Sequence, residues 1–174
     1  MKFRQYLNEM AMRSEDDLPD EVVVVRRSFA GGHGVIVYYA DRETLQETEE
    51  DGNWSWPTKP HGMLHMHLAR DGIFQLSEVY ASEGWGPLLH DLAIEYATAH
   101  GKGMMCDPRE MSGDAIGVFT YYFQKRGDVQ KEMAPPGMVP PKYSSHLELQ
   151  YVYRKPDQAR TQDMRTNEQL IEYN

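Results

Sequence analysis

A strand, a glycine turn and a helix follow one another between residues 73 and 97, and together they could hold a phosphate group. The β-branched and aromatic run at 73–80 follows an Asp-Gly turn and predicts a strand. The glycines of Ser82-Glu-Gly-Trp-Gly86 then allow backbone angles that other residues avoid. Pro87 suits the first position of a helix. Free amides and a helix dipole would meet at this turn, as in phosphate sites. The helix repeats apolar residues at spacings of three and four: Leu88, Leu89, Leu92, Ala93, Tyr96 and Ala97.

Two histidines occupy alternate positions of another predicted strand, residues 63–68. His65 and His67 share one face with Met63, whereas the other face is apolar. Histidines at i and i+2 could bind a metal, but no third ligand is evident nearby in the sequence. Polar lining of a cleft is therefore the favoured interpretation. A tight turn at 69–72 joins this strand to the one at 73–80.

The remaining elements predict the sheet that would position these groups. β-branched and aromatic runs predict strands at 22–26 and 35–39, joined by a glycine-rich connection in which His33 is interpreted as a loop residue. Short strands are expected at 104–106 and 129–133, and a well-alternating strand at 146–154. A second helix is predicted by its N-cap and periodic face, which are Ser112, then Ala115, Val118, Phe119, Tyr122, Phe123 and Arg126. The expected fold class is α/β, with a mixed, mostly antiparallel sheet, a central strand–helix–strand unit and flanking helices.

Composition limits the function classes. A chain of 174 residues is most simply one domain, and its net charge of −9 makes nucleic acid an unexpected partner. The single cysteine, Cys106, excludes an intrachain disulfide and suits a reducing cytoplasm. No apolar run approaches the roughly 18 residues of a membrane span, and no signal peptide is evident. A cytoplasmic protein with no membrane partner is expected.

Three segments are expected to lie outside the main domain or on its surface. Residues 1–20 are expected to form an amphipathic helix and a solvated acidic linker. The helix is interpreted first as docking on the domain and otherwise as a partner-binding or targeting segment, and it should be dispensable for ligand binding at the glycine turn. The main domain spans 21–155, and the polar tail at 156–174 is expected to fray or dock weakly. The segment 41–61 predicts a long surface loop, whose Trp54 and Trp56 either line a substrate cleft or anchor the loop.

The segment 73–97 resembles the acetyl-CoA-binding motif of the GNAT acyltransferases, in which a strand, a Gly-x-Gly turn and a helix hold the pyrophosphate. Gly84, Gly86 and Leu89 match the last two glycines and a following leucine of that motif. A second match, Ser112-x-x-Ala-x-x-x-Phe119, follows the spacing of the Asn-x-x-Ala-x-x-x-Tyr pattern of these enzymes.

The resemblance covers roughly residues 22–155. The sequence Gly-Trp-Gly-Pro-Leu-Leu is similar to the corresponding sequence of GNAT-like proteins of tailed phages. It implies a GNAT-like fold, an N-acetyltransferase that uses acetyl-CoA and an unidentified amine acceptor, and the host cytoplasm if a phage encodes the chain. The implied cofactor-binding residues are Val79, Tyr80, Ala81, Glu83, Gly84, Trp85, Gly86, Leu88, Leu89, Ser112 and Phe119.

The same resemblance assigns chemistry to particular groups. A backbone N–H near Val79 or Tyr80 would polarise the thioester carbonyl. Glu78 could take the proton of the amine through water, or it could be a carboxylate at the solvent end of a strand. Tyr122 is either a proton donor or a core residue, and Tyr121 is the second candidate donor.

Departures from the motif keep two alternatives open. Ala81 and Ser82 stand where an Arg or Gln and the first glycine are usual, and Pro87 removes one amide. Phe119 replaces a tyrosine that often acts as general acid. The alternatives are a catalytically inactive binding or structural protein, which could be virion-associated, and a transferase that uses another acyl or aminoacyl donor.

Overall fold

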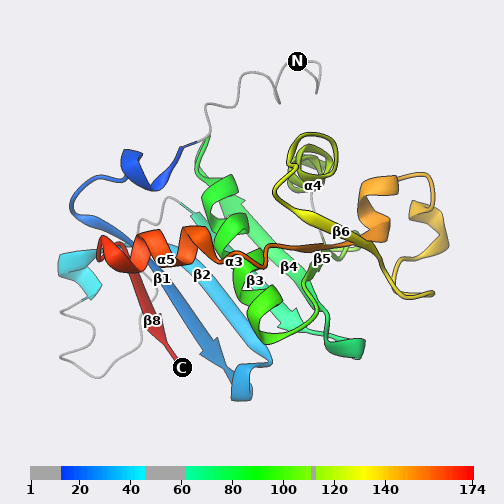
Figure 1. Cartoon of the computed structure of the whole chain (residues 1–174), viewed down its shortest axis with the longest axis horizontal. Helices are drawn as coiled ribbons and strands as arrows, with labels where there is room; N and C mark the ends of the chain where they lie inside the picture. The colour runs from blue at the N-terminus through cyan, green and yellow to red at the C-terminus, as the bar shows by residue number, and fades with distance from the viewer. Residues whose placement is uncertain (1–12, 46–61, 111–112) are drawn as a thin grey trace.

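The fold is α/β, with helices packed on a mixed sheet (Figure 1). A computed structural model describes residues 13–45, 62–110 and 113–174. Within these ranges the strands are β1 Val22–Phe29, β2 Gly34–Asp41, β3 Gly62–Leu68, β4 Phe74–Ala81, β5 Met104–Cys106, β6 Gln130–Met133, β7 Tyr151–Arg154 and β8 Leu170–Tyr173. The α-helices are α3 Gly86–His100, α4 Gly113–Lys125 and α5 Ala159–Thr166.

The strands form one sheet in the order β6-β7-β5-β4-β3-β2-β1-β8. Strands β1 to β4 are successive antiparallel neighbours, while β4 and β5 are parallel and are joined by α3. The predicted mixed, mostly antiparallel sheet with a central strand–helix–strand unit is therefore confirmed. Among the described residues, no helix combines the length and apolar character that a membrane span requires.

Helix α3 is buried on nearly all sides because other elements cover the side that faces away from the sheet. It contacts the sheet strands β3, β4 and β7, and it also contacts α5; Figure 1 shows α3 and α5 crossing one face of the sheet. Leu88, Leu89 and Leu92, predicted to be on its apolar face, lie in the main core. His90, Asp91 and Glu95 are also buried, at 2% exposure or less.

The polar segment at 156–174 is part of the fold, so the prediction of a weakly docked tail is wrong. Its α5 packs on α3, and its β8 pairs in parallel with β1. The carboxylate of Glu95 accepts hydrogen bonds from the backbone N–H groups of Arg160 and Thr161, at 3.0 and 2.7 Å. A buried acceptor on α3 therefore fixes the first turn of a helix whose own sequence is polar.

A buried ion-pair cluster surrounds the same carboxylate, and its members are Asp91, Glu95, Arg126, Lys155 and Arg160. Lys155 Nζ lies 2.9 Å from Glu95 Oε1 and 3.6 Å from Asp91 Oδ2. Arg126 and Arg160 approach Asp91 at 3.2 and 3.5 Å. These contacts tie α3 to the end of α4, the end of β7 and α5.

Two further predictions need correction. The strand expected at 146–154 begins only at Tyr151, because Leu147–Gln150 form a 3-10 helix whose turn is closed by Leu149 N–H donating to His146 O. The acidic linker is not wholly solvated, since Glu15 is buried and pairs with Arg160. The expected helix at 3–12, Trp54, Trp56 and Ser112 lie outside the described residues.

Candidate functional site

Strands β4 and β5 pair only at their beginnings. The paired residues run from Phe74–Met104 to Leu76–Cys106, and Asp107 N–H donates to Leu76 O at 3.2 Å. Strand β4 then continues to Ala81, whereas β5 ends. In the described part of the chain, 77–81 of β4 therefore have no partner on the β5 side, and the sheet opens there.

The glycine turn lies directly after this opening. Gly84 has φ of +84°, a left-handed conformation that favours glycine, and Trp85 N–H donates to Ser82 O at 3.0 Å. Tyr39 Oη donates to Trp85 O at 2.7 Å and fixes the turn against β2. No side chain of the described residues caps α3. The amides of its first turn, apart from that of Pro87, are therefore available to an anion.

The other implied cofactor-binding residues fall into two groups. Tyr80, Ala81 and Glu83 are exposed at the end of β4 and in the turn. Leu88 and Leu89 have buried side chains, so only their backbone amides could serve a ligand. A Cβ added to Gly86 would meet only the Cβ of Ala81, at 3.7 Å, so the approach to the turn is open at Gly86.

Arg13 is a residue at this turn that sequence reasoning missed. Its N–H donates to Gly84 O at 3.0 Å, and its guanidinium lies 5.7 Å from the centroid of the Trp85 ring. The side chain is exposed and places a positive charge beside the helix N-terminus. No sequence motif identifies this arginine, because its contact with the glycine turn depends on the position of the segment that precedes the first strand. The structure also shows that residues 13–18 are not a separable linker.

A β-bulge determines where Glu78 points. His65 pairs with Glu78 and Met66 pairs with Leu76, which leaves Ser77 as an extra residue in β4. In a regular strand Glu78 would share the face of Leu76. Because of the bulge, Ser77 and Glu78 both line the face opposite α3, while Val79 packs against the core beneath α3.

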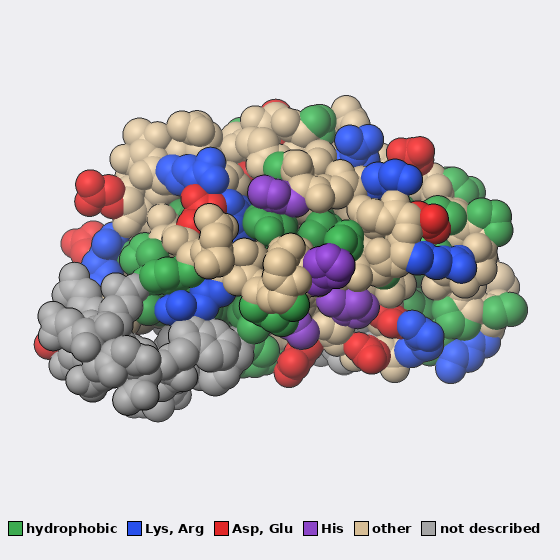
Figure 2. Space-filling model, turned by 90° about the horizontal axis from the view of Figure 1, so that it is seen from below, with side chains coloured by type: hydrophobic (Ala, Val, Ile, Leu, Met, Phe, Trp, Pro, Cys, Tyr) green, Lys and Arg blue, Asp and Glu red, His purple; other side chains and the backbone are tan. Residues whose placement is uncertain are grey.

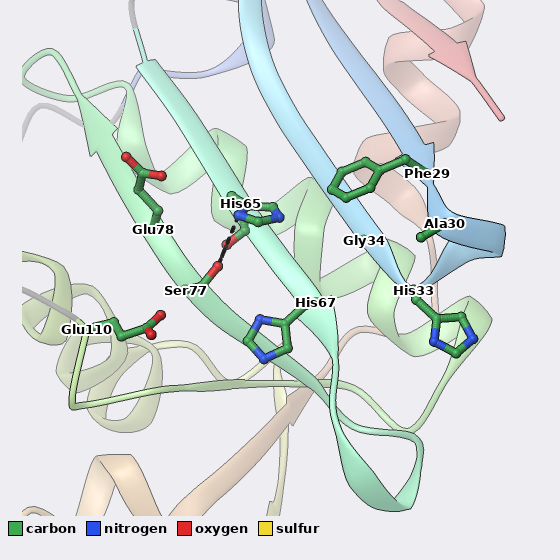
Figure 3. A pocket seen from close by; sticks show the side chains of 9 residues that line it. All are labelled: Phe29, Ala30, His33, Gly34, His65, His67, Ser77, Glu78 and Glu110. Carbon is green, nitrogen blue, oxygen red and sulfur yellow. Dashed lines mark hydrogen bonds between the residues drawn. The ribbon is translucent and has the colours of Figure 1, made fainter.

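An open hollow of about 480 Å³ lies on that opposite face, over β3 and β4. Figure 2 shows histidine side chains gathered beside acidic ones on the molecule viewed from below. In Figure 3, Ser77, Glu78 and Glu110 line one side of the hollow and Phe29 and His33 line the other. Between them lie the two histidines of β3, His65 and His67. The predicted polar lining of a cleft by these histidines is confirmed.

His65 is held in place by Ser77 and Phe29. Its Nδ1 is 3.2 Å from Ser77 Oγ, which also donates to the backbone oxygen of His65 at 3.2 Å. The Phe29 ring stacks on the imidazole with centroids 5.7 Å apart. Burial lowers the pKa of His65, and the neighbouring His67 lowers it further, although Glu78 and Glu110 act in the opposite direction. The imidazole is therefore neutral at neutral pH.

Tyr122 and Phe119 lie in the core, between α4 and α3. Both are fully buried, and the hydroxyl of Tyr122 donates to Asp91 Oδ1 in a short hydrogen bond. Burial and the neighbouring carboxylate raise the pKa of Tyr122 well above its usual value. Tyr122 is therefore interpreted as a core residue, and we do not assign it as the proton donor. Phe119 packs edge-on against His90.

The structure thus brings the glycine turn and Glu78 to one end of β4, but on two faces of the sheet, while Phe119 and Tyr122 stay in the core. Glu78 joins the hollow with Ser77 and Glu110, neither of which was singled out from the sequence. Glu110 follows β5, and side chains that follow neighbouring parallel strands collect at the same edge of a sheet. Searches with the chain against family models, curated proteins and solved structures found no match.

Proposed function

We propose that the chain is a GNAT-like N-acyltransferase that moves an acetyl group from acetyl-CoA to an amine. One observation carries the proposal: β4 separates from β5 directly before an uncapped helix N-terminus, while Glu78 faces a hollow at the same point of the strand. Donor and acceptor could approach this point from opposite faces of the sheet. The mixed sheet with its central strand–helix–strand unit is consistent with a GNAT-like fold.

The residues around the turn fit a pyrophosphate. The amides of Gly86, Leu88 and Leu89 would bind its oxygens, assisted by the dipole of α3 and the charge of Arg13. The open edge of β4 offers backbone groups to the extended arm of the donor. Acetyl-CoA would supply the activated acetyl thioester, and an N–H near Val79 or Tyr80 would stabilise the negative charge that develops on its carbonyl oxygen.

Glu78 is the proposed general base. Its carboxylate faces the hollow, and within the described residues it forms no ion pair, so it is available to take a proton from the amine directly or through water. We assign no proton donor to the departing thiolate, because the Tyr122 hydroxyl is hydrogen-bonded to Asp91 and Pro87 O.

The test is acetyl-CoA binding by Gly86→Val, measured by calorimetry. The new side chain meets only ordinary contact within the protein, so the fold should survive while the approach of the pyrophosphate is obstructed. Gly127→Val is the matched control, since a Cβ there meets nothing within 4 Å. We expect binding to be lost in Gly86→Val and kept in the control. Equal affinity in both variants would place the donor elsewhere.

The position of Phe119 favours a second candidate, a binding protein of the same fold without turnover. Phe119 has no proton to give, and the nearby Tyr122 is already hydrogen-bonded. Tight acetyl-CoA binding without thiol release for any amine would support this candidate. A transferase with another acyl donor would instead release product from that donor.

A further inference from the structure

We propose that the hollow receives the acceptor as the ammonium ion of an aliphatic amine, held between the carboxylates of Glu78 and Glu110. This inference rests on the proposed function and names its acceptor class. It follows from the charges of the hollow, the shape of its wall and the chemistry that Glu78 must perform.

The charges of the hollow favour a cation. Its lining includes two carboxylates and no lysine or arginine. Within the described residues, neither Glu78 nor Glu110 takes part in an ion pair, whereas most buried carboxylates of this chain do. The histidine beside them, His65, is neutral at neutral pH because burial lowers its pKa. An ammonium ion would therefore meet two uncompensated negative charges, and an anionic acceptor would be repelled.

The wall of the hollow suits an aliphatic chain. The Phe29 ring lies so close to Gly34 that an added Cβ would be 2.1 Å from it, and Phe29 as a whole is 42% exposed. The ring stacks on His65, so an apolar surface lies on the side of the hollow opposite the two carboxylates. A volume of about 480 Å³ is that of a site for a small molecule or a single side chain.

The reaction balances with the groups present. The ammonium ion gives one proton to the Glu78 carboxylate, and the neutral nitrogen attacks the thioester carbon. The C–N bond forms, the C–S bond breaks, and the electron pair leaves on the thiolate of CoA. The thiolate takes up the second proton that the nitrogen loses. The overall products are the amide, the free thiol and one proton, which Glu78 returns to solvent.

Three amines of equal chain length test the charge preference: diaminobutane, butylamine and aminobutanoate. At the end of the chain opposite the reacting amine, diaminobutane carries a positive group, butylamine carries no charged group and aminobutanoate carries a negative group. With thiol release as the readout, we expect kcat/KM to fall in that order. A short lysine-containing peptide separates the two sources of this chemistry: faster acetylation of the peptide would identify a protein side chain, and faster acetylation of diaminobutane a small polyamine.

Glu110→Gln tests the assigned residue. We expect KM for diaminobutane to rise about tenfold, the size of a lost partly exposed charge contact, with little change in kcat or in acetyl-CoA affinity. Glu132→Gln, an exposed glutamate on β6, is the matched control and should behave as the parent. Glu110→Lys should reverse the preference toward aminobutanoate. A parent that prefers aminobutanoate, or an unchanged KM in Glu110→Gln, would overturn the inference.

Direct binding separates this inference from the proposed function. Diaminobutane is titrated into the protein without acetyl-CoA and followed by NMR of the histidine side chains. Shifts in the parent that need about tenfold more diamine in Glu110→Gln would support the ammonium site even if acetyl-CoA failed to bind. Acetyl-CoA binding with no effect of diamine on the histidines would overturn the ammonium site and leave the transferase proposal intact.

Discussion

The chain places carboxylates on both sides of its sheet, and the two sets have opposite surroundings. On the α3 side, Asp91 and Glu95 are buried in the ion-pair cluster with Arg126, Lys155 and Arg160. On the other side, Glu78 and Glu110 border an open hollow without ion pairs among the described residues. Paired, dehydrated carboxylates hold elements together, while unpaired and accessible ones are free to act on a ligand.

This difference separates stability from activity, because removal of one partner from a buried pair leaves a charge that water cannot reach. Removal of an exposed carboxylate leaves nothing unsatisfied. Substitutions on the α3 side should therefore change the free energy of unfolding, and substitutions in the hollow should change turnover. The following variants test that division.

Glu95→Ala should have the largest effect. It leaves Lys155, which is 3% exposed, without its closest partner, and it removes the acceptor for two N–H groups of α5. We expect the free energy of unfolding, measured with urea, to fall by about 3–5 kcal/mol. Glu132→Ala, on the exposed face of an edge strand, should change it by less than about 0.5 kcal/mol. Equal small losses in both would show that the cluster contributes little.

Glu78→Gln should leave the fold and acetyl-CoA affinity unchanged but slow thiol release by about 10² to 10⁴-fold. The amide keeps the size of the side chain and removes the base. The defect should be greatest at lower pH, where more of the amine is protonated. Turnover equal to that of the parent would remove Glu78 from the mechanism.

His90 and His65 allow the two sides of the sheet to be compared by the pH dependence of stability, because burial lowers the pKa of each imidazole. An imidazole whose pKa is lowered by folding binds its proton more readily in the unfolded chain, so stability should fall as pH drops below about 6.5, the unfolded value. The slope is at most about 1.4 kcal/mol per pH unit for each group.

His90 is fully buried on the α3 side, with Nδ1–H donating to Gly86 O at 2.8 Å, while His65 is only half-buried in the hollow. His90→Asn should therefore flatten the pH dependence of urea unfolding between pH 6.5 and 5 more than His65→Asn does. Parallel curves for His90→Asn and the parent would contradict the assignment of this slope to His90.

Arg13→Ala should have the smallest effect, because an exposed charge is screened by water and salt. We expect acetyl-CoA affinity to fall by about 0.5–1 kcal/mol at low salt, with less difference at high salt. Deletion of residues 1–12 keeps Arg13 and should preserve the affinity. Deletion of residues 1–18 also removes Arg13 and the Glu15–Arg160 pair, so it should weaken both binding and stability. Unchanged affinity in Arg13→Ala would exclude a contact with the donor.

Local sequence patterns were sufficient to predict most strands of the sheet. The valine run at 22–25, the alternation at 63–68 and the spacing of leucines in α3 each predict an element that the structure contains. The polar α5 was missed because its docking depends on the carboxylate of Glu95, a residue far away in sequence.

The candidate site was only partly predictable for a similar reason. The glycine turn and Glu78 were identified from local sequence, but no residue type signals the bulge at Ser77 that turns Glu78 toward the hollow. Glu110 and Arg13 lie at the site because the fold brings distant segments of the chain together, and the spacing of residues along the sequence does not reveal this.

The pairing of β8 with β1 also protects the protein from self-association. β1 contains four consecutive valines, each no more than 9% exposed, and its outer edge would be a template for another strand if it were uncovered. β8 occupies that edge from Val24 to Arg27, and the sheet now ends on two short strands, β8 and the charged β6. A chain cut before residue 170 would expose the valine strand, and we expect it to aggregate rather than simply to lose stability.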